Sequence, residues 1–75
     1  MYPNPANHSI HVGQEMAGKK LDHIRIYDSI GKMVMTKKLD DARQSIDVSS
    51  LSGGLYFVEL ITAKGEVMDS RFIKQ

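Results

Sequence analysis

The stretch SSLSGGLYFVEL, residues 49–60, places two glycines directly before the most hydrophobic run of the chain. Adjacent glycines mark either a sharp change of chain direction or a loop that holds a phosphate or exposes a nucleophile. In an extended chain the residues that follow are apolar on both faces, with Tyr56, Val58 and Leu60 on one face and Leu55, Phe57 and Ile61 on the other. This pattern predicts a strand at the centre of a sheet.

Apolar and polar residues alternate in most of the remaining chain, in segments 8–12, 21–28, 32–39, 45–48 and 67–74. A period of two is typical of strands with one buried face. In segment 32–39 the alternation groups Met33 with Met35 and sets them opposite Val34 and Thr36. Only residues 39–44 have a helix-like composition, and they are too few for a stable helix.

Two four-residue stretches between these segments have turn composition, DSIG at 28–31 and TAKG at 62–65. Each ends in a glycine, Gly31 or Gly65, where a type I turn needs a left-handed residue before the next strand. Both stretches predict β-hairpins. Six or seven short strands joined in this way predict an all-β fold, an immunoglobulin-like antiparallel β-sandwich.

The composition is that of one small globular domain. The 75 residues are 41% hydrophobic and 25% charged, with a formal net charge of +1. Such a balanced charge argues against a nucleic-acid partner or a membrane surface. The chain has no cysteine, which excludes disulfides and thiolate chemistry. No apolar run reaches the roughly 20 residues of a membrane-spanning helix.

The first residues differ in composition from the rest. Residues 1–7 are rich in Pro and Asn, so we expect a linker from an upstream domain there and the sandwich in residues 8–75. Met1 precedes Tyr-Pro-Asn-Pro, which has neither the basic start nor the apolar core of a signal peptide. We therefore expect the natural protein to extend upstream.

The sequence patterns do not support catalysis. His8 and His11 are three residues apart, so a strand would place them on opposite faces, where they cannot share a metal ion. The serines around Gly53 and Gly54 lack the Gly-x-Ser-x-Gly spacing of a nucleophile elbow, and the glycines lack the following Lys-Ser/Thr of a phosphate loop. We expect a non-enzymatic domain with no catalytic, cofactor-binding or metal site.

A structural role for the glycine pair is the better interpretation. In immunoglobulin-like sandwiches a tyrosine near the start of a central strand bonds back to the backbone a few residues upstream. Here Leu51 would act as a buried plug, Gly53 and Gly54 would carry the chain from one sheet to the other, and the Tyr56 hydroxyl would fix the corner. The alternative is that Tyr56 is only a core aromatic residue.

Taken in order, these motifs resemble a known family. The matching positions are Tyr2-Pro3-Asn4-Pro5, Tyr27-Asp28, Gly31-Lys32, Leu51, Gly54, Tyr56, Gly65 and Phe72-Ile73-Lys74. They extend over practically the whole chain and are similar to the Por secretion tail, the type A C-terminal sorting domain of the type IX secretion system. Three positions depart from the family pattern: Gly53 stands where relatives often carry another small residue or proline, Arg71 where many have lysine, and Gln75 follows the last lysine.

The resemblance implies a function that is a signal rather than a reaction. Domains of this family are immunoglobulin-like sandwiches at the C-terminus of larger cargo proteins, among them proteases, adhesins and glycan-active enzymes. The cargo reaches the periplasm by an N-terminal signal peptide, and the tail directs it across the outer membrane through the shuttle and translocon of the secretion machinery. A surface sortase then removes the tail, and the cargo stays on the cell surface or is secreted.

The residues that the machinery recognises are expected at the end of the chain. The last strand is a candidate edge strand, open to β-augmentation. Arg71 and Lys74 would supply charge, and Phe72 or Ile73 would anchor in a receptor pocket. The alternative is that Phe72 and Ile73 only complete the core.

Two further questions stay open at this stage. A structural or glycan-binding β-sandwich module of a cell-surface protein is the alternative function, although the absence of tryptophan disfavours glycan binding. The oligomeric state is undetermined, and exchange of an edge strand between copies is one route to self-association.

Overall fold

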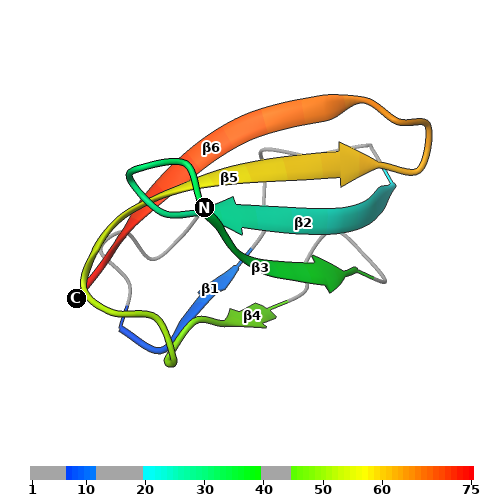
Figure 1. Cartoon of the computed structure of the whole chain (residues 1–75). Coiled ribbons are helices and arrows are strands. Elements are labelled where there is room, and N and C mark those ends of the chain that lie inside the picture. The colour runs from blue at the N-terminus through cyan, green and yellow to red at the C-terminus, as the bar shows by residue number, and fades with distance from the viewer. Residues whose placement is uncertain (1–6, 12–19, 40–44) are drawn as a thin grey trace.

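The computed structural model describes residues 7–11, 20–39 and 45–75, and every regular element among them is a β-strand (Figure 1). The strands are β1 (Ser9–His11), β2 (Leu21–Tyr27), β3 (Met33–Lys38), β4 (Ser45–Asp47), β5 (Gly54–Thr62) and β6 (Val67–Lys74). The prediction of an all-β chain is confirmed. The expectations for the linker, for Val12 and for residues 40–44 lie outside the described residues.

The strands form two antiparallel sheets. One sheet pairs β1 with β4, and the other has the order β3-β2-β5-β6. The predicted central strand is confirmed, because β5 lies between β2 and β6. Among the described strands, β6 is at the end of its sheet, as expected from the sequence. This arrangement is that of an immunoglobulin-like sandwich.

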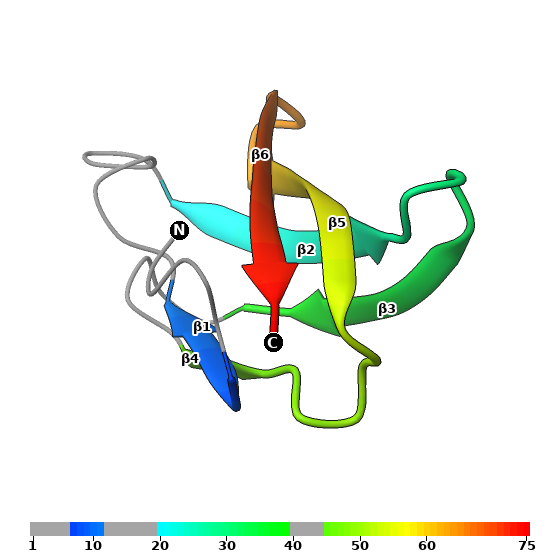
Figure 2. The ribbon, with the colours of Figure 1, turned by 90° about the vertical axis from the view of Figure 1, so that its left-hand side faces the viewer.

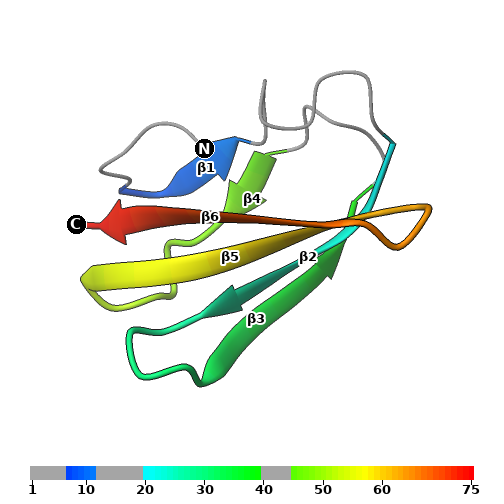
Figure 3. The same ribbon diagram turned by 90° about the horizontal axis from the view of Figure 1, so that it is seen from above.

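The core lies between the two sheets. Figures 2 and 3 show β1 and β4 as a small separate layer beside the larger, strongly twisted sheet. The buried cluster follows period-two alternation along most of the strands. In β2 the register shift between Leu21 and His23 lets Leu21 join Ile24 and Ile26 in the core, although alternation alone would separate them. The members of the cluster are Ile10, Leu21, Ile24, Ile26, Leu39, Ile46, Val48, Tyr56, Val58, Leu60 and Phe72. The other face of the four-stranded sheet therefore points away from the small layer.

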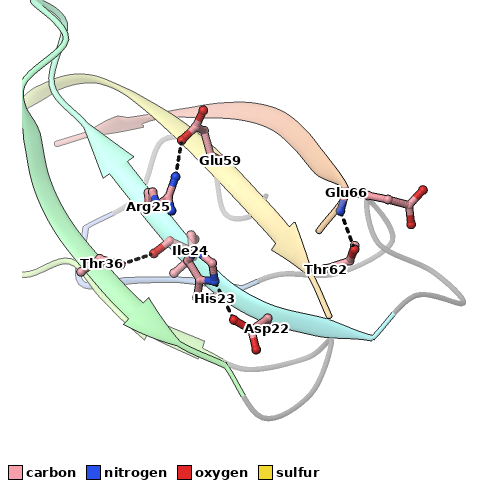
Figure 4. Close-up of polar contacts among 8 residues, drawn as sticks. All are labelled: Asp22, His23, Ile24, Arg25, Thr36, Glu59, Thr62 and Glu66. Atoms are coloured by element: carbon pink, nitrogen blue, oxygen red, sulfur yellow. Dashed lines mark hydrogen bonds and ion pairs between the residues drawn. The ribbon is translucent and has the colours of Figure 1, made fainter. Parts of the chain in front are cut away.

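Both predicted hairpins are present. In the β2–β3 turn, the Gly31 amide donates to the Asp28 carbonyl at 3.1 Å, and in the β5–β6 turn the Gly65 amide donates to the Thr62 carbonyl at 2.9 Å. Both glycines have a φ of 89°, the left-handed conformation expected from the sequence. Thr62 also accepts a hydrogen bond from the Glu66 amide through its Oγ1, at 3.0 Å (Figure 4).

The predicted face assignment of the β3 methionines is wrong. The pairing of β2 with β3 shifts register between Ile26 and Tyr27, so that Met35 pairs with Ile26 and Met33 pairs with Tyr27. Met35 consequently packs against the core, whereas Met33 is exposed on the opposite face. The extra residue in β3, Val34, makes this irregularity, which alternation alone does not reveal.

Candidate functional site

The glycine-rich stretch turns the chain from the small sheet into the large one. β4 belongs to the two-stranded sheet and β5 to the four-stranded sheet, so residues 48–53 make the crossing. The turn begins with the Leu51 amide, which donates to the Val48 carbonyl at 3.0 Å. Leu51 is half-buried and packs against the core, which agrees with its predicted role as a plug.

The Tyr56 hydroxyl fixes this corner. It donates to the Ser52 carbonyl at 2.6 Å, four residues upstream, and its Oη lies 3.4 Å from the Ser52 Oγ. The tyrosine is only 5% exposed, whereas Ser52 is exposed, so the bond joins a buried ring to the partly buried backbone of the corner. Loss of a partner at such a position has a cost in free energy. The predicted tyrosine corner is confirmed.

The corner also holds the end of β6. Tyr56 pairs with Phe72 across the strands, and the two rings stack with their centroids 5.4 Å apart. Gly54 pairs with Lys74 and has a φ of 147°, while a Cβ at Gly53 would lie 3.4 Å from the Lys74 carbonyl oxygen. The structure thus brings together the two sets of residues that the sequence singled out separately.

The four candidate recognition residues alternate between the two faces of β6. Phe72 is fully buried and Lys74 is 8% exposed, with its Nζ donating to the Gln75 carbonyl at 2.9 Å. Arg71 and Ile73 lie on the outer face, where Ile73 is 50% exposed. The remaining structural glycines, Gly31 and Gly65, lie in the two hairpin turns, which are separate in sequence from residues 71–74 of β6.

The outer face next to these residues carries a polar cluster that the sequence did not single out. The Tyr27 hydroxyl donates to Glu59 Oε1 at 2.8 Å. The Arg25 guanidinium lies 3.7 Å from the same oxygen, as Figure 4 shows for this pair. The hydrogen bond to the Glu59 carboxylate raises the pKa of Tyr27 above its ordinary value. Alternation had placed Arg25 and Tyr27 on one face of β2, but only the register of β5 brings Glu59 beside them.

Two apolar residues of β5 extend this outer surface toward β6. Leu55 pairs with Ile73, and Phe57 pairs with Arg71 on one side and Tyr27 on the other. Leu55 is 38% exposed and Phe57 is 42% exposed. Both belong to the central strand β5, but their side chains point to its outer face, because they alternate with residues whose side chains are buried. The surface around Arg71 and Ile73 is therefore apolar with isolated charges.

A second polar contact stabilises the turn before the corner. The Asp47 carboxylate accepts a hydrogen bond from the Ser49 amide at 2.8 Å. Hydrogen bonds from Ser49 hold the pKa of Asp47 below its ordinary value. This is a local turn motif and gives the site no chemical reactivity.

The described residues do not gather the groups of a metal site. No cluster of three or more His, Cys, Asp or Glu side chains occurs among residues 7–11, 20–39 and 45–75. Of the histidines, His23 contacts the neighbouring Asp22 carboxylate at 2.7 Å (Figure 4), whereas His8 is exposed and His11 half-buried. In this same part of the chain, no helix is long and apolar enough to span a membrane.

The fold and the site together define a small β-sandwich module in which a structural corner supports a surface strand. The family model for secretion-system C-terminal sorting domains, the Por secretion tail, matches residues 1–75, so the chain belongs to this family. The beta-agarase D of Zobellia galactanivorans is a similar protein, 32% identical over 75 residues. The match covers 97% of this chain but only 14% of that relative. No solved structure matches the chain.

Family membership gives the domain its role. It is a C-terminal sorting signal of the type IX secretion system, carried by a cargo protein for export across the outer membrane to the cell surface or beyond. The sorting domain is itself non-catalytic.

Proposed function

We propose that the secretion machinery recognises this domain through the outward side of the C-terminal end of β6, formed by Arg71 and Ile73. The observation that carries the proposal is the alternation of β6, in which these two side chains point outward while Phe72 and Lys74 point inward. Of the four candidates from the sequence, Phe72 and Lys74 then act indirectly, by fixing the strand that presents the other two.

The chemistry of this surface indicates what the receptor presents. Ile73 and its cross-strand neighbour Leu55 form an apolar spot, and Arg71, which is exposed, pairs with Phe57 across the strands and brings a positive charge to the same surface. A receptor with an apolar pocket flanked by an acidic residue matches both features.

Membership of the family supports a proposal for the route of the cargo. We propose that an upstream cargo domain in the same chain crosses the periplasm with this domain attached, and that the outer-membrane shuttle and translocon bind the domain there. A surface sortase then removes it. The identity of the cargo is independent of this proposal, because the domain contains the signal in a separately folded unit.

The proposal is tested by fusing residues 1–75 to a reporter directed to the periplasm of a host with type IX secretion. Ile73→Ser and Arg71→Glu should each reduce surface display of the reporter. Truncation of a central interface residue costs about 1–2 kcal/mol, which lowers affinity roughly fivefold to thirtyfold.

Val67→Ser is the matched control. Val67 lies on the same strand and the same outer face, with 54% exposure against 50% for Ile73, but at the other end of β6. Thermal melts of the isolated domains establish that all three variants fold. Equal display of the Ile73→Ser, Arg71→Glu and Val67→Ser fusions would exclude this end of β6 as the recognised surface.

A further inference from the structure

The outer face of the four-stranded sheet is unusually apolar for a surface of so small a domain. Met33 is 51% exposed and Phe57 42%, and the register places both in line with Tyr27, on the face opposite the core residues Ile26 and Val58. Exposed apolar residues scattered singly are ordinary, but contiguous ones mark interaction sites. Here they are contiguous, because the register places them in one row.

Two neighbouring rows cross all four strands on this face. The first row runs, in the order β3-β2-β5-β6, through Met33, Tyr27, Phe57 and Arg71. The second row, in the same order, runs through Thr36, Arg25, Glu59 and Asp69. The first row is therefore mostly apolar, and the second is polar with its opposite charges on the two central strands.

Both rows have a symmetry about the line between β2 and β5. Across that line the aromatic residue Tyr27 is opposite the aromatic residue Phe57, and the positive Arg25 is opposite the negative Glu59. A two-fold axis along this line would place the same face of a second copy over the first. In that arrangement β2 of one copy lies over β5 of the other, and β3 lies over β6. Tyr27 would then face Phe57, and Arg25 would face Glu59, in both directions at once. At the edges of the rows, Met33 would face Arg71, whose long side chain can turn its guanidinium toward water.

We propose that this face binds the same face of a second copy of the chain, with the two-fold axis parallel to the strands between β2 and β5. The two Arg25–Glu59 pairs then form an alternating arrangement of four charges, in which Arg25 and Glu59 each have an opposite charge beside them in their own copy and across the interface. Asp69, which pairs with Glu59 on β6, would face Thr36 of the other copy. Self-complementarity of this kind is what a two-fold interface requires of one surface patch. Face-to-face packing of aligned sheets is also a common geometry.

The other in-plane two-fold axis is much less favourable. An axis perpendicular to the strands keeps each strand over its own counterpart, so that Arg25 never faces Glu59. Along the second row this axis would place Arg25 over Arg25, and midway between the rows it would bring the Phe57 ring over the Glu59 carboxylate. Covering a charge with an apolar ring costs free energy without a compensating partner. The charge pattern therefore selects one of the two arrangements.

The size of the face sets the strength of the association. Four strands about 4.8 Å apart, over about five residues of strand length, give a projected area of roughly 300–400 Å² for each copy. Stable complexes bury about 800 Å² for each partner. We therefore expect a weak, reversible dimer that forms at high protein concentration, and its formation does not depend on the sorting role.

The experiment is sedimentation velocity on the 75-residue chain over a hundredfold range of concentration, up to the millimolar range. The unmodified chain should shift reversibly from monomer toward dimer. Arg25→Glu and Glu59→Arg should each abolish the shift, because like charges would then face each other. Lys64→Glu in the β5–β6 turn, with the same change of net charge as Arg25→Glu, should leave the shift unchanged.

Mixing the two charge-reversed variants separates this interface from other causes. Arg25→Glu and Glu59→Arg are complementary across the proposed interface, so an equimolar mixture should sediment as a heterodimer although neither variant associates alone. This result also shows that both variants are folded. A chain that stays monomeric at every concentration would overturn the proposal. Association that survives Arg25→Glu, as exchange of edge strands would, would overturn it equally.

Discussion

At the residue scale, the hydrogen bond from the Tyr56 hydroxyl to the Ser52 carbonyl fixes the corner at which the chain passes from one sheet to the other. It joins the crossing between the sheets to the start of β5, and the stacked ring of Phe72 holds the same tyrosine from the other side. The corner could be predicted from sequence because its parts are contiguous in the chain. The stack could not, since it depends on the register of β6.

Replacement of Tyr56 by phenylalanine removes this one hydrogen bond and keeps the ring. We expect Tyr56→Phe to lower the free energy of unfolding by about 1–2 kcal/mol, because the Ser52 carbonyl would lose a largely buried partner. For a domain of this size, each kcal/mol corresponds to about 4–8 °C in Tm.

Tyr27→Phe is the matched control for this measurement. It also removes a tyrosine hydroxyl bond, to Glu59, but at a half-exposed position where water replaces the lost partner. Its Tm should stay close to that of the unmodified chain. Equal losses for the two variants would show that the corner bond has no special structural role.

The Asp47 carboxylate gives stability at this scale a dependence on pH. Hydrogen bonds from Ser49 lower the pKa of Asp47 in the folded state relative to the unfolded state. The folded state therefore binds this proton less tightly, and the stabilisation is present above the unfolded pKa of about 4 and lost as the pH falls through the folded pKa.

We expect the free energy of unfolding to fall less steeply for Asp47→Asn than for the unmodified chain between about pH 5 and pH 2. Urea unfolding at a series of pH values measures both slopes. Parallel slopes would mean that the hydrogen bonds from Ser49 do not distinguish the folded state from the unfolded state.

At the scale of elements, β6 has two faces with different tasks. The buried side chain of Phe72 belongs to the core, whereas Ile73 is half exposed on the outer face. The sequence left two roles open for these residues, to complete the core or to anchor in a receptor. Phe72 lies on the face that packs in the core, and Ile73 lies on the face that a receptor could contact. Period-two alternation had already separated Phe72 from Ile73, but it could not show which face was inside, because both faces carry apolar residues.

Conservative substitutions distinguish the two faces. Phe72→Leu should lower the free energy of unfolding by about 1–3 kcal/mol, through lost volume in the core and the lost stack on Tyr56. Ile73→Val should change it by less than about 0.5 kcal/mol, as is usual for surface positions. Chemical denaturation of both variants gives the comparison, and a larger loss for Ile73→Val would contradict the assignment of the faces.

At the scale of the whole molecule, the sequence alone predicted the strands, the two hairpins, the sheet crossing and the family. These features depend on local residue patterns and on motifs in a fixed order. The outer-face cluster of Arg25, Tyr27 and Glu59 was not predictable, because it depends on the pairing of strands more than 30 residues apart in sequence. The Val34 irregularity was missed for the related reason that a single extra residue reverses the faces beyond it.

The central claim is that this sandwich is sufficient as a sorting signal, and one measurement tests it most directly. Residues 1–75 are fused to the C-terminus of a reporter directed to the periplasm, in a host with type IX secretion and in an otherwise identical strain that lacks it. Surface labelling of intact cells measures display. We predict display in the competent host and retention in the periplasm of the deficient strain, whereas a folded fusion retained in the periplasm of the competent host would contradict the claim.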